Sequence, residues 1–182
     1  GHCNSVIDVI INSKKFQIEF FLDDSSKSKI LKKKKNFNGK KFFKENKKNK
    51  NIHISFASIY NLNERLALYE KIKKNNIYNF PNIISSTSYV SSSCKLTEGI
   101  IILNKAIVNS NVEISENVII NTGSIIEHDV VIGKNSHIST GVIVNGGVKI
   151  GKNCFIGSGS IIKENIQIPD NTFVKMGSFI KK

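Results

Sequence analysis

The stretch IIEHDVVIGKNSHISTGVIVNGGVKIGKNCFIGSGSII, from Ile125 to Ile162, carries a branched aliphatic residue at every sixth position. The same register extends outward without a slip to Ser88 and to the end of the chain. The third members of the successive six-residue units are Val90, Leu96, Ile102, Val108, Ile114, Ile120, Ile126, Ile132, Ile138, Val144, Ile150, Ile156, Ile162, Ile168, Val174 and Ile180. Neither a helix nor an alternating strand has a period of six, so the repeat predicts a parallel β-solenoid with this aliphatic column inside.

Two further ladders indicate that the solenoid has three sides. Sixth members of the units repeat every 18 residues, at Asn117, Asn135, Asn153, Asn171, Gly123, Gly141, Gly159 and Gly177. Asn and Gly tolerate a positive φ at low cost, so these positions are predicted corners. The sixteen units then make a little over five coils, stacked about 4.8 Å apart. A two-sheet sandwich is disfavoured, because its turns fall irregularly, about every 8 to 12 residues.

The chain has a net charge of +13, and most of this charge lies before the repeat. Twelve lysines crowd positions 27 to 50, where Glu45 is the single acidic residue. Nucleic-acid binding would favour arginines, interleaved aromatic residues or a recognisable module, so we interpret this stretch as a solvated loop and expect no nucleic-acid partner.

Other classes are excluded by simple features of the sequence. No apolar run reaches the roughly 20 residues of a membrane span, and no signal peptide is visible, so we expect a cytoplasmic protein without a membrane span. Cys3, Cys94 and Cys154 form no CxxC pair, which argues against a disulfide framework and a cysteine zinc site. Cys154 is interpreted as a packing residue and not as a nucleophile.

The N-terminal part has the pattern of half a βαβ unit. Residues 1–10, GHCNSVIDVI, are typical of an apolar helix, and residues 16–24, FQIEFFLDD, of a strand that ends in Asp23 and Asp24. Residues 52–56, IHISF, predict another strand. A helix is predicted from near Asn61, with one apolar face formed by Leu62, Leu66, Tyr69 and Ile72.

The repeat resembles the left-handed β-helix of the hexapeptide-repeat acyltransferases. Within that group, residues 125–162 are similar to the bacterial sugar acetyltransferases of the sialic-acid O-acetyltransferase and bacillosamine-pathway (UDP-4-amino-sugar) N-acetyltransferase family. The resemblance implies an incomplete Rossmann-like, sugar-nucleotide-binding α/β domain over residues 1–80, a linker over 81–87 and an all-β left-handed parallel β-helix over 88–182. Relative to that family the chain is expected to be truncated at both ends.

Residues of the repeat suggest acyl transfer at one corner. Gly146 follows His128 by 18 residues and is therefore predicted to lie directly above it, leaving the imidazole uncovered and a backbone N–H available to a thioester carbonyl. Histidine is suited to accept a proton near neutral pH and needs a partner on its other nitrogen. Glu127 and Asp129 both flank His128; we favour Asp129, which occupies a corner position.

The resemblance implies further roles for individual residues. It makes His128 the general base and His137 a second histidine that contacts the substrate and the acetyl group of acetyl-CoA, near Gly146. Asn121 is implied as a substrate contact. Gly1, His2, Asp23 and Asp24 are implied to hold the sugar nucleotide, although Asp23 and Asp24 fit equally well as residues that end a strand.

We therefore expect an acetyl-CoA-dependent N-acetyltransferase that acts on a nucleotide-linked amino sugar in bacterial glycan biosynthesis. The alternatives are sugar O-acetylation and a non-catalytic, structural β-helix. No metal is expected, because the solenoid holds only two histidines, and His2 and His53 lie in the other domain. A homotrimer is expected from the outward column Ile119, His137 and Phe155, whose apolar wall needs a partner.

Overall fold

The computed structural model describes residues 1–22, 35–37, 50–57, 59, 61–74 and 77–182. Its N-terminal part contains two helices, α1 (His2–Ser13) and α3 (Leu62–Lys73). Two short parallel strand pairs accompany them, β1 (Phe20–Leu22) with β2 (Lys35–Phe37) and β3 (Lys50–Asn51) with β4 (Tyr78–Asn79). The predicted helices are thus confirmed. Asp23, Asp24 and nearly all of the lysine-rich stretch lie outside the described residues.

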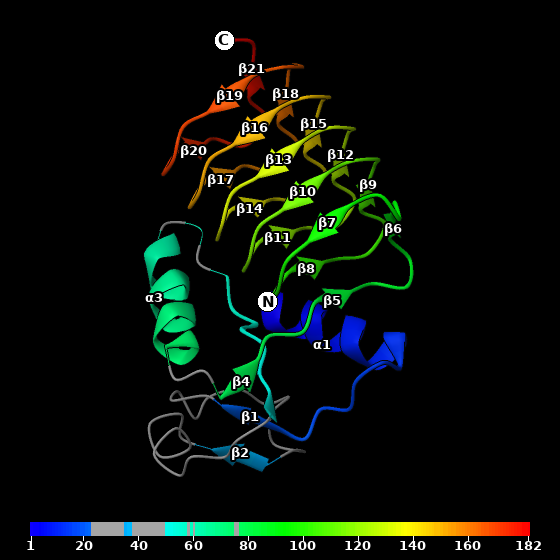
Figure 1. The fold of residues 1–182 in the computed structure, drawn as a ribbon, viewed down its shortest axis with the longest axis vertical. Helices are drawn as coiled ribbons and strands as arrows, with labels where there is room; N and C mark the ends of the chain where they lie inside the picture. The colour runs from blue at the N-terminus through cyan, green and yellow to red at the C-terminus, as the bar shows by residue number, and fades with distance from the viewer. Residues whose placement is uncertain (23–34, 38–49, 58, 60, 75–76) are drawn as a thin grey trace.

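The rest of the chain is a three-sided parallel β-solenoid of two-residue strands, stacked from β5 to β21 in Figure 1. The β5 wall consists of β5 (Ile83–Ile84), β8 (Ile101–Ile102), β11 (Ile119–Ile120), β14 (His137–Ile138), β17 (Phe155–Ile156) and β20 (Phe173–Val174). The β6 wall consists of β6 (Tyr89–Val90), β9 (Ile107–Val108), β12 (Ile125–Ile126), β15 (Ile143–Val144), β18 (Ile161–Ile162) and β21 (Phe179–Ile180). The β7 wall consists of β7 (Lys95–Leu96), β10 (Glu113–Ile114), β13 (Val131–Ile132), β16 (Lys149–Ile150) and β19 (Gln167–Ile168).

The predicted register is confirmed throughout the solenoid. Each strand pairs with the strand 18 residues away, as His137 pairs with Phe155. The third members of the units fill the interior as one aliphatic cluster. The predicted corners are also confirmed: Asn135 has φ 59° and Gly141 has φ 66°, in the left-handed region. β5 pairs with β8, so the ladder already includes Ile83–Ile84, inside the expected linker.

The N-terminal part packs against the first coils of the solenoid, where α1 lies across the end next to β5 and α3 stands beside the coils (Figure 1). Val6 and Val9 of α1 form one buried cluster with Ile101 and Ile119 of the β5 wall. This contact buries apolar side chains of both parts, which stabilises their association by roughly 25 cal/mol per Å² of buried apolar surface.

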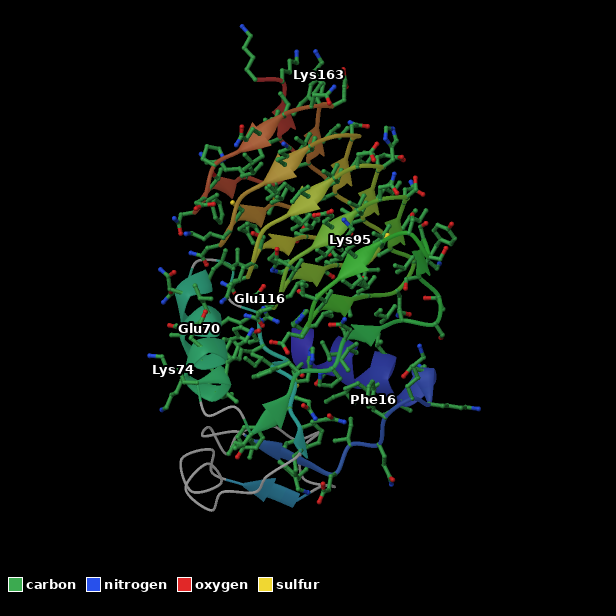
Figure 2. All side chains as sticks on the ribbon, viewed as in Figure 1. Phe16, Glu70, Lys74, Lys95, Glu116 and Lys163 are labelled. Carbon is green, nitrogen blue, oxygen red and sulfur yellow. The ribbon has the colours of Figure 1, made fainter. Side chains whose placement is uncertain are left out.

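The contact between α3 and the solenoid is polar and charged. The Lys134 ammonium, on a solenoid corner, forms ion pairs with Glu70 of α3 and with Glu116 of the coil below. Figure 2 shows Glu70 and Glu116 facing the same gap. Tyr69 of α3 donates a hydrogen bond to Glu98 at 2.8 Å.

The predicted strand over residues 52–56 is wrong. The pairing of β3 with β4 ends at Asn51, and Ile52 donates the last hydrogen bond, to the Asn79 carbonyl at 2.9 Å. Ile52 and Ile54 are buried as their alternation suggested, but residues 52–56 are not assigned to a strand, because burial alone does not supply a hydrogen-bonded neighbour. Within the described residues, no helix is long and apolar enough to cross a bilayer.

Candidate active site

The corner between β12 and β13 carries His128 and Asp129. Asp129 has φ 59°, the left-handed conformation of a corner residue. Nδ1 of His128 lies 2.8 Å from Oδ2 of Asp129. Because an ionised carboxylate can only accept, the imidazole Nδ1–H donates and Nε2 keeps its lone pair. The His128 side chain is 61% exposed, so this lone pair is open to a ligand from solvent.

Asp129 is held in place by a second donor. Its Oδ1 accepts a hydrogen bond from Nδ2 of Asn111, on the coil below, at 3.1 Å. The hydrogen bond from His128, and then the one from Asn111, hold the pKa of Asp129 below its usual value. Glu127 is occupied elsewhere, because it accepts a hydrogen bond from Nδ2 of Asn109 at 3.0 Å. The geometry therefore pairs His128 with Asp129 and not with Glu127.

Gly146 lies against the His128 ring, on the next coil. A Cβ atom at position 146 would lie 2.7 Å from Cε1 and 2.8 Å from Nε2 of His128. The φ of Gly146 is not positive, so the position needs glycine for space and not for its backbone conformation. The Gly146 N–H meets no backbone acceptor among the described residues. A free N–H thus lies beside the free imidazole nitrogen.

His137 is buried on the β5 wall. Its Nε2 lies 3.2 Å from Nδ2 of Asn121, and the ring of Phe155 packs edge-on at 5.2 Å. Burial, followed by the nearby His2 and Arg65, lowers the pKa of His137 to about 3, so the imidazole is neutral. The Asn121 amide donates to Nε2, which leaves Nδ1 as the protonated nitrogen.

The expected exposed column on this wall is wrong. Ile119, His137 and Phe155 are only 1%, 4% and 5% exposed. They do point away from the solenoid core, as expected. However, α1 covers Ile119, and the ring of His2 lies 6.2 Å from that of His137. The chain's own N-terminal part therefore supplies the partner of this wall, and the column gives no support for a trimer.

An apolar column is exposed on the β6 wall instead. The outward residues of its strands are all apolar and exposed or half-buried, namely Tyr89, Ile107, Ile125, Ile143, Ile161 and Phe179. The corresponding outward residues of the β7 wall are mostly polar, namely Lys95, Glu113, Val131, Lys149 and Gln167. The sequence contained this signal, since both columns follow the 18-residue spacing.

Within one chain, His128 and His137 are not brought together. His128 lies at the corner that joins the β6 wall to the β7 wall, whereas His137 is part of the β5 wall, across the core. Asn121 begins the corner that joins the β5 wall to the β6 wall. The two histidines therefore lie on opposite sides of the β6 wall.

The remaining expected residues lie at the start of α1. Gly1 is the N-cap of this helix, and His2 is its first residue. Burial, the Arg65 charge and the terminal ammonium lower the pKa of His2 to about 4. His2 is thus brought next to His137, whereas Asp23 and Asp24 lie outside the described residues.

Arg65 was missed from the sequence. It is 2% exposed and lies on the buried face of α3 with Tyr69 and Ile72. Its Nη1 donates to the Asn117 carbonyl and, at 3.5 Å, to Oδ1 of Asn135. Helical spacing places position 65 on the same face as 69 and 72, so an arginine at an inward position was the available signal.

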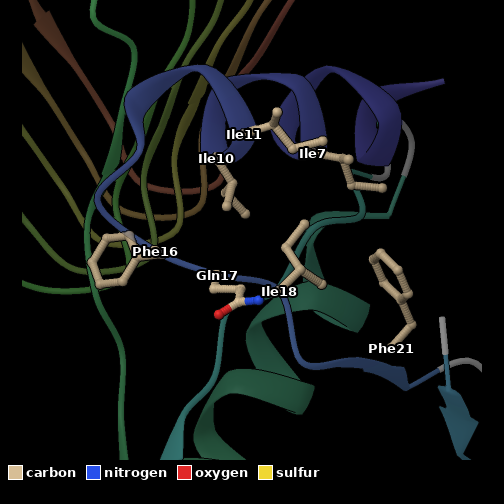
Figure 3. A pocket seen from close by; sticks show the side chains of 7 residues that line it. All are labelled: Ile7, Ile10, Ile11, Phe16, Gln17, Ile18 and Phe21. Carbon is tan, nitrogen blue, oxygen red and sulfur yellow. The ribbon is translucent and has the colours of Figure 1, made fainter.

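A separate hollow lies between α1 and the segment that follows it (Figure 3). Its volume is about 350 Å³, and it is lined by Ile7, Ile10, Ile11, Phe16, Gln17, Ile18 and Phe21. No lining side chain can titrate, so this hollow provides no group for acid–base chemistry. Among the residues that the structure describes, no cluster of three His, Cys, Asp or Glu side chains could hold a metal ion.

The fold and this corner define a hexapeptide-repeat solenoid with a histidine–carboxylate pair and an α/β domain docked on one wall. Residues 1–72 match the family described as PglD N-terminal domain, which is Rossmann-like. Residues 147–182 match the bacterial transferase hexapeptide (six repeats), and residues 123–145 match the hexapeptide repeat of succinyl-transferase. The expected combination of a Rossmann-like domain and a hexapeptide solenoid is confirmed.

Solved structures share this fold over nearly the whole chain. A histidine-to-asparagine mutant of perosamine N-acetyltransferase from Caulobacter crescentus, in complex with CoA and GDP-perosamine, has a TM-score of 0.73 and 19% identity, covering 95% of this chain and 88% of that one. The acetyltransferase domain of PglB from Neisseria gonorrhoeae, in complex with acetyl coenzyme A, has a TM-score of 0.72 and 18% identity, covering 95% and 90%. WeeI from Acinetobacter baumannii has a TM-score of 0.74 and 19% identity, covering 99% and 90%. No curated protein matches the chain by sequence. The expected resemblance to sugar acetyltransferases is thereby confirmed at the level of the fold.

Proposed function

We propose that the chain is an acetyl-CoA-dependent N-acetyltransferase that acts on a nucleotide-linked amino sugar in bacterial glycan biosynthesis. The observation that carries the proposal is the His128–Asp129 pair, whose free Nε2 lies against Gly146. The similar perosamine N-acetyltransferase structure holds CoA and GDP-perosamine, and the similar PglB domain holds acetyl coenzyme A. These ligands support the two substrates proposed for this chain.

In the proposed reaction, His128 is the general base. Its Nε2 takes a proton from the sugar amine as the amine nitrogen attacks the thioester carbonyl carbon, so that a C–N bond forms. Asp129 holds the imidazole in the required tautomer and stabilises the imidazolium. The Gly146 N–H donates to the carbonyl oxygen as it becomes negative. When the C–S bond breaks, the imidazolium returns the proton to the coenzyme A thiolate, and the histidine is neutral again.

The site requires a second copy of the chain if both histidines contact the substrates. We propose a cyclic homotrimer in which the exposed apolar column of the β6 wall faces the three-fold axis. Each β6 wall is flanked by two corners, one with His128 and the other with Asn121. Rotation about the axis places the His128 corner of one copy beside the Asn121 corner of the next copy. His128 would thus act on a substrate bound near Asn121 and His137 of the neighbouring copy.

Substrate-dependent release of the free thiol from acetyl-CoA tests this function. UDP- and GDP-linked amino sugars should release thiol, and the matching 4-hydroxy sugars should not. Thiol release with the hydroxy sugars alone would favour O-acetylation, and no release with any sugar would leave a structural solenoid. Nucleotide sugars and acetyl-CoA are cytoplasmic metabolites, so the proposed reaction takes place in the cytoplasm.

A further inference from the structure

Four unpartnered polar atoms lie together between α1, α3 and the β5 wall. They are Nε and Nη2 of Arg65, Nε2 of His2 and Nδ1 of His137, which are buried and have no hydrogen-bond partner in the described part of the chain. Buried polar groups are paired in the great majority of cases, so a group of four such atoms needs a physical explanation.

These atoms belong to neighbouring side chains. The rings of His2 and His137 lie 6.2 Å apart. Arg65 contacts Asn135, two residues before His137, and its charge lowers the pKa of both histidines. His2 also starts α1, a helix of 12 residues without a side-chain cap and without an acidic residue in its first turn. The positive end of the helix therefore points into the same region as the arginine.

The charge of Arg65 is not compensated by the described residues. The cations around it are paired, since Lys73 forms ion pairs with Glu98 and Glu116, and Lys134 with Glu70 and Glu116. Arg65 forms no ion pair in the described part of the chain, although it is nine-tenths buried and more. A buried charge without a counter-charge is costly, and an anion would remove that cost.

The hydrogen-bond roles fit an anion. The guanidinium offers two free N–H groups, and the Nδ1 of His137 is protonated because Nε2 accepts from Asn121. His53 is also close, but its Nδ1 lies 3.2 Å from the Pro81 carbonyl and must donate to it, so its buried Nε2 carries a lone pair. His53 is therefore not a ligand of an anion.

We infer that Arg65, with His137 and the His2 end of α1, forms an oxyanion seat that binds the diphosphate of a substrate. The inference rests on the proposed function, in which both substrates carry a diphosphate, the nucleotide sugar and coenzyme A. The seat lies between the N-terminal part and the β5 wall, on the far side of the solenoid core from the His128 corner of the same chain. It would therefore fix the non-reacting end of the substrate and leave the chemistry to His128.

Calorimetric titration of the full chain tests the seat with inorganic pyrophosphate, UDP, GDP, uridine and CoA. Arg65→Gln should weaken pyrophosphate and UDP binding about ten- to hundredfold, the usual effect of losing charge-assisted hydrogen bonds, and should leave uridine binding unchanged. Arg65→Lys should recover part of the loss. Lys149→Gln removes an exposed charge on the β7 wall and should bind every ligand as the wild type does. A loss confined to CoA would keep the seat and assign it to the coenzyme.

Unchanged pyrophosphate binding in a folded Arg65→Gln variant would overturn the inference, as would a wild type that binds neither pyrophosphate nor UDP. If Arg65→Gln does not fold, the same comparison is made by melting temperature with His2→Phe, which removes the ring nitrogens at the rim. Pyrophosphate should raise the melting temperature of the wild type and raise that of His2→Phe less; an equal rise would reject the seat. Thiol release is measured separately, so pyrophosphate binding without turnover would contradict the proposed function alone.

Discussion

Gly146 and His128 occupy the same corner on consecutive coils, in contact, so that the smallest side chain at position 146 would enter the imidazole ring. The added Cβ would lie 2.7 Å from Cε1 and 2.8 Å from Nε2, closer than real Cβ atoms approach. The contact leaves the ring one open side, where Nε2 and the Gly146 N–H meet. The predictions below begin with this pair.

Replacing His128 by alanine should abolish most turnover and leave stability nearly unchanged. General-base catalysis contributes about 10²- to 10⁴-fold, and turnover should fall by about that factor. The side chain is 61% exposed and has little packing to lose. Steady-state thiol release and a thermal melt check both statements; a variant with wild-type turnover would remove His128 from the mechanism.

Asp129→Asn separates the carboxylate from the corner conformation. Asparagine adopts the left-handed conformation of Asp129, φ 59°, as it does at Asn111 and Asn135, so the melting temperature should be retained. The amide cannot stabilise an imidazolium and permits the wrong tautomer, so kcat should fall at least about tenfold with little change in KM. Glu127→Gln is the matched control, since Glu127 pairs with Asn109, and it should keep wild-type kcat.

Gly146→Ala should reduce kcat without a large loss of stability. The methyl group forces the exposed His128 ring to move, and an exposed side chain can do so at low cost. Gly141→Ala is the opposite control: its Cβ meets nothing within 4 Å, but its φ of +66° strains alanine, so stability should fall by about 1 kcal/mol with kcat retained. Equal kcat for the Gly146 variant and the wild type would show that the ring has space to spare.

Stability should decrease as the pH falls below about 6.5. Burial lowers the pKa of His2 to about 4 and the pKa values of His53 and His137 to about 3, from 6.5. Between these values the unfolded chain binds protons that the folded chain does not. Each histidine therefore removes up to about 1.4 kcal/mol of unfolding free energy per pH unit as the pH falls. His53→Gln should make the decline in melting temperature from pH 7.5 to pH 5 shallower, and an unchanged decline would contradict a buried, neutral His53.

The β6 wall should be an interface between copies. Wild type should sediment at about 61 kDa, the mass of three chains of 20.3 kDa. Ile143→Lys places a charge in the middle of the exposed apolar column and should yield monomers. Gln167→Lys, on the polar β7 wall, should keep the mass of the wild type. A wild-type monomer at micromolar concentration would reject the trimer and with it the shared site.

The sequence by itself determined the solenoid, since one aliphatic residue in every six and a corner residue in every eighteen admit one coil geometry. The same register placed Gly146 on His128 before any coordinates, because each position in a solenoid contacts the position one coil away. Pairing of Asp129 rather than Glu127 with His128 also followed from the corner position. These features are periodic and local, and periodic patterns can be read from one chain.

The tertiary structure decided which wall is covered. Both the β5 and the β6 walls present apolar columns in the sequence, and only the docking of α1 shows that Ile119 and His137 are buried while Ile107 and Ile161 are not. The same docking makes Arg65 a buried charge next to His2 and His137, residues far apart in the chain. Such long-range contacts depend on how two different elements pack, and no period in the sequence records that packing.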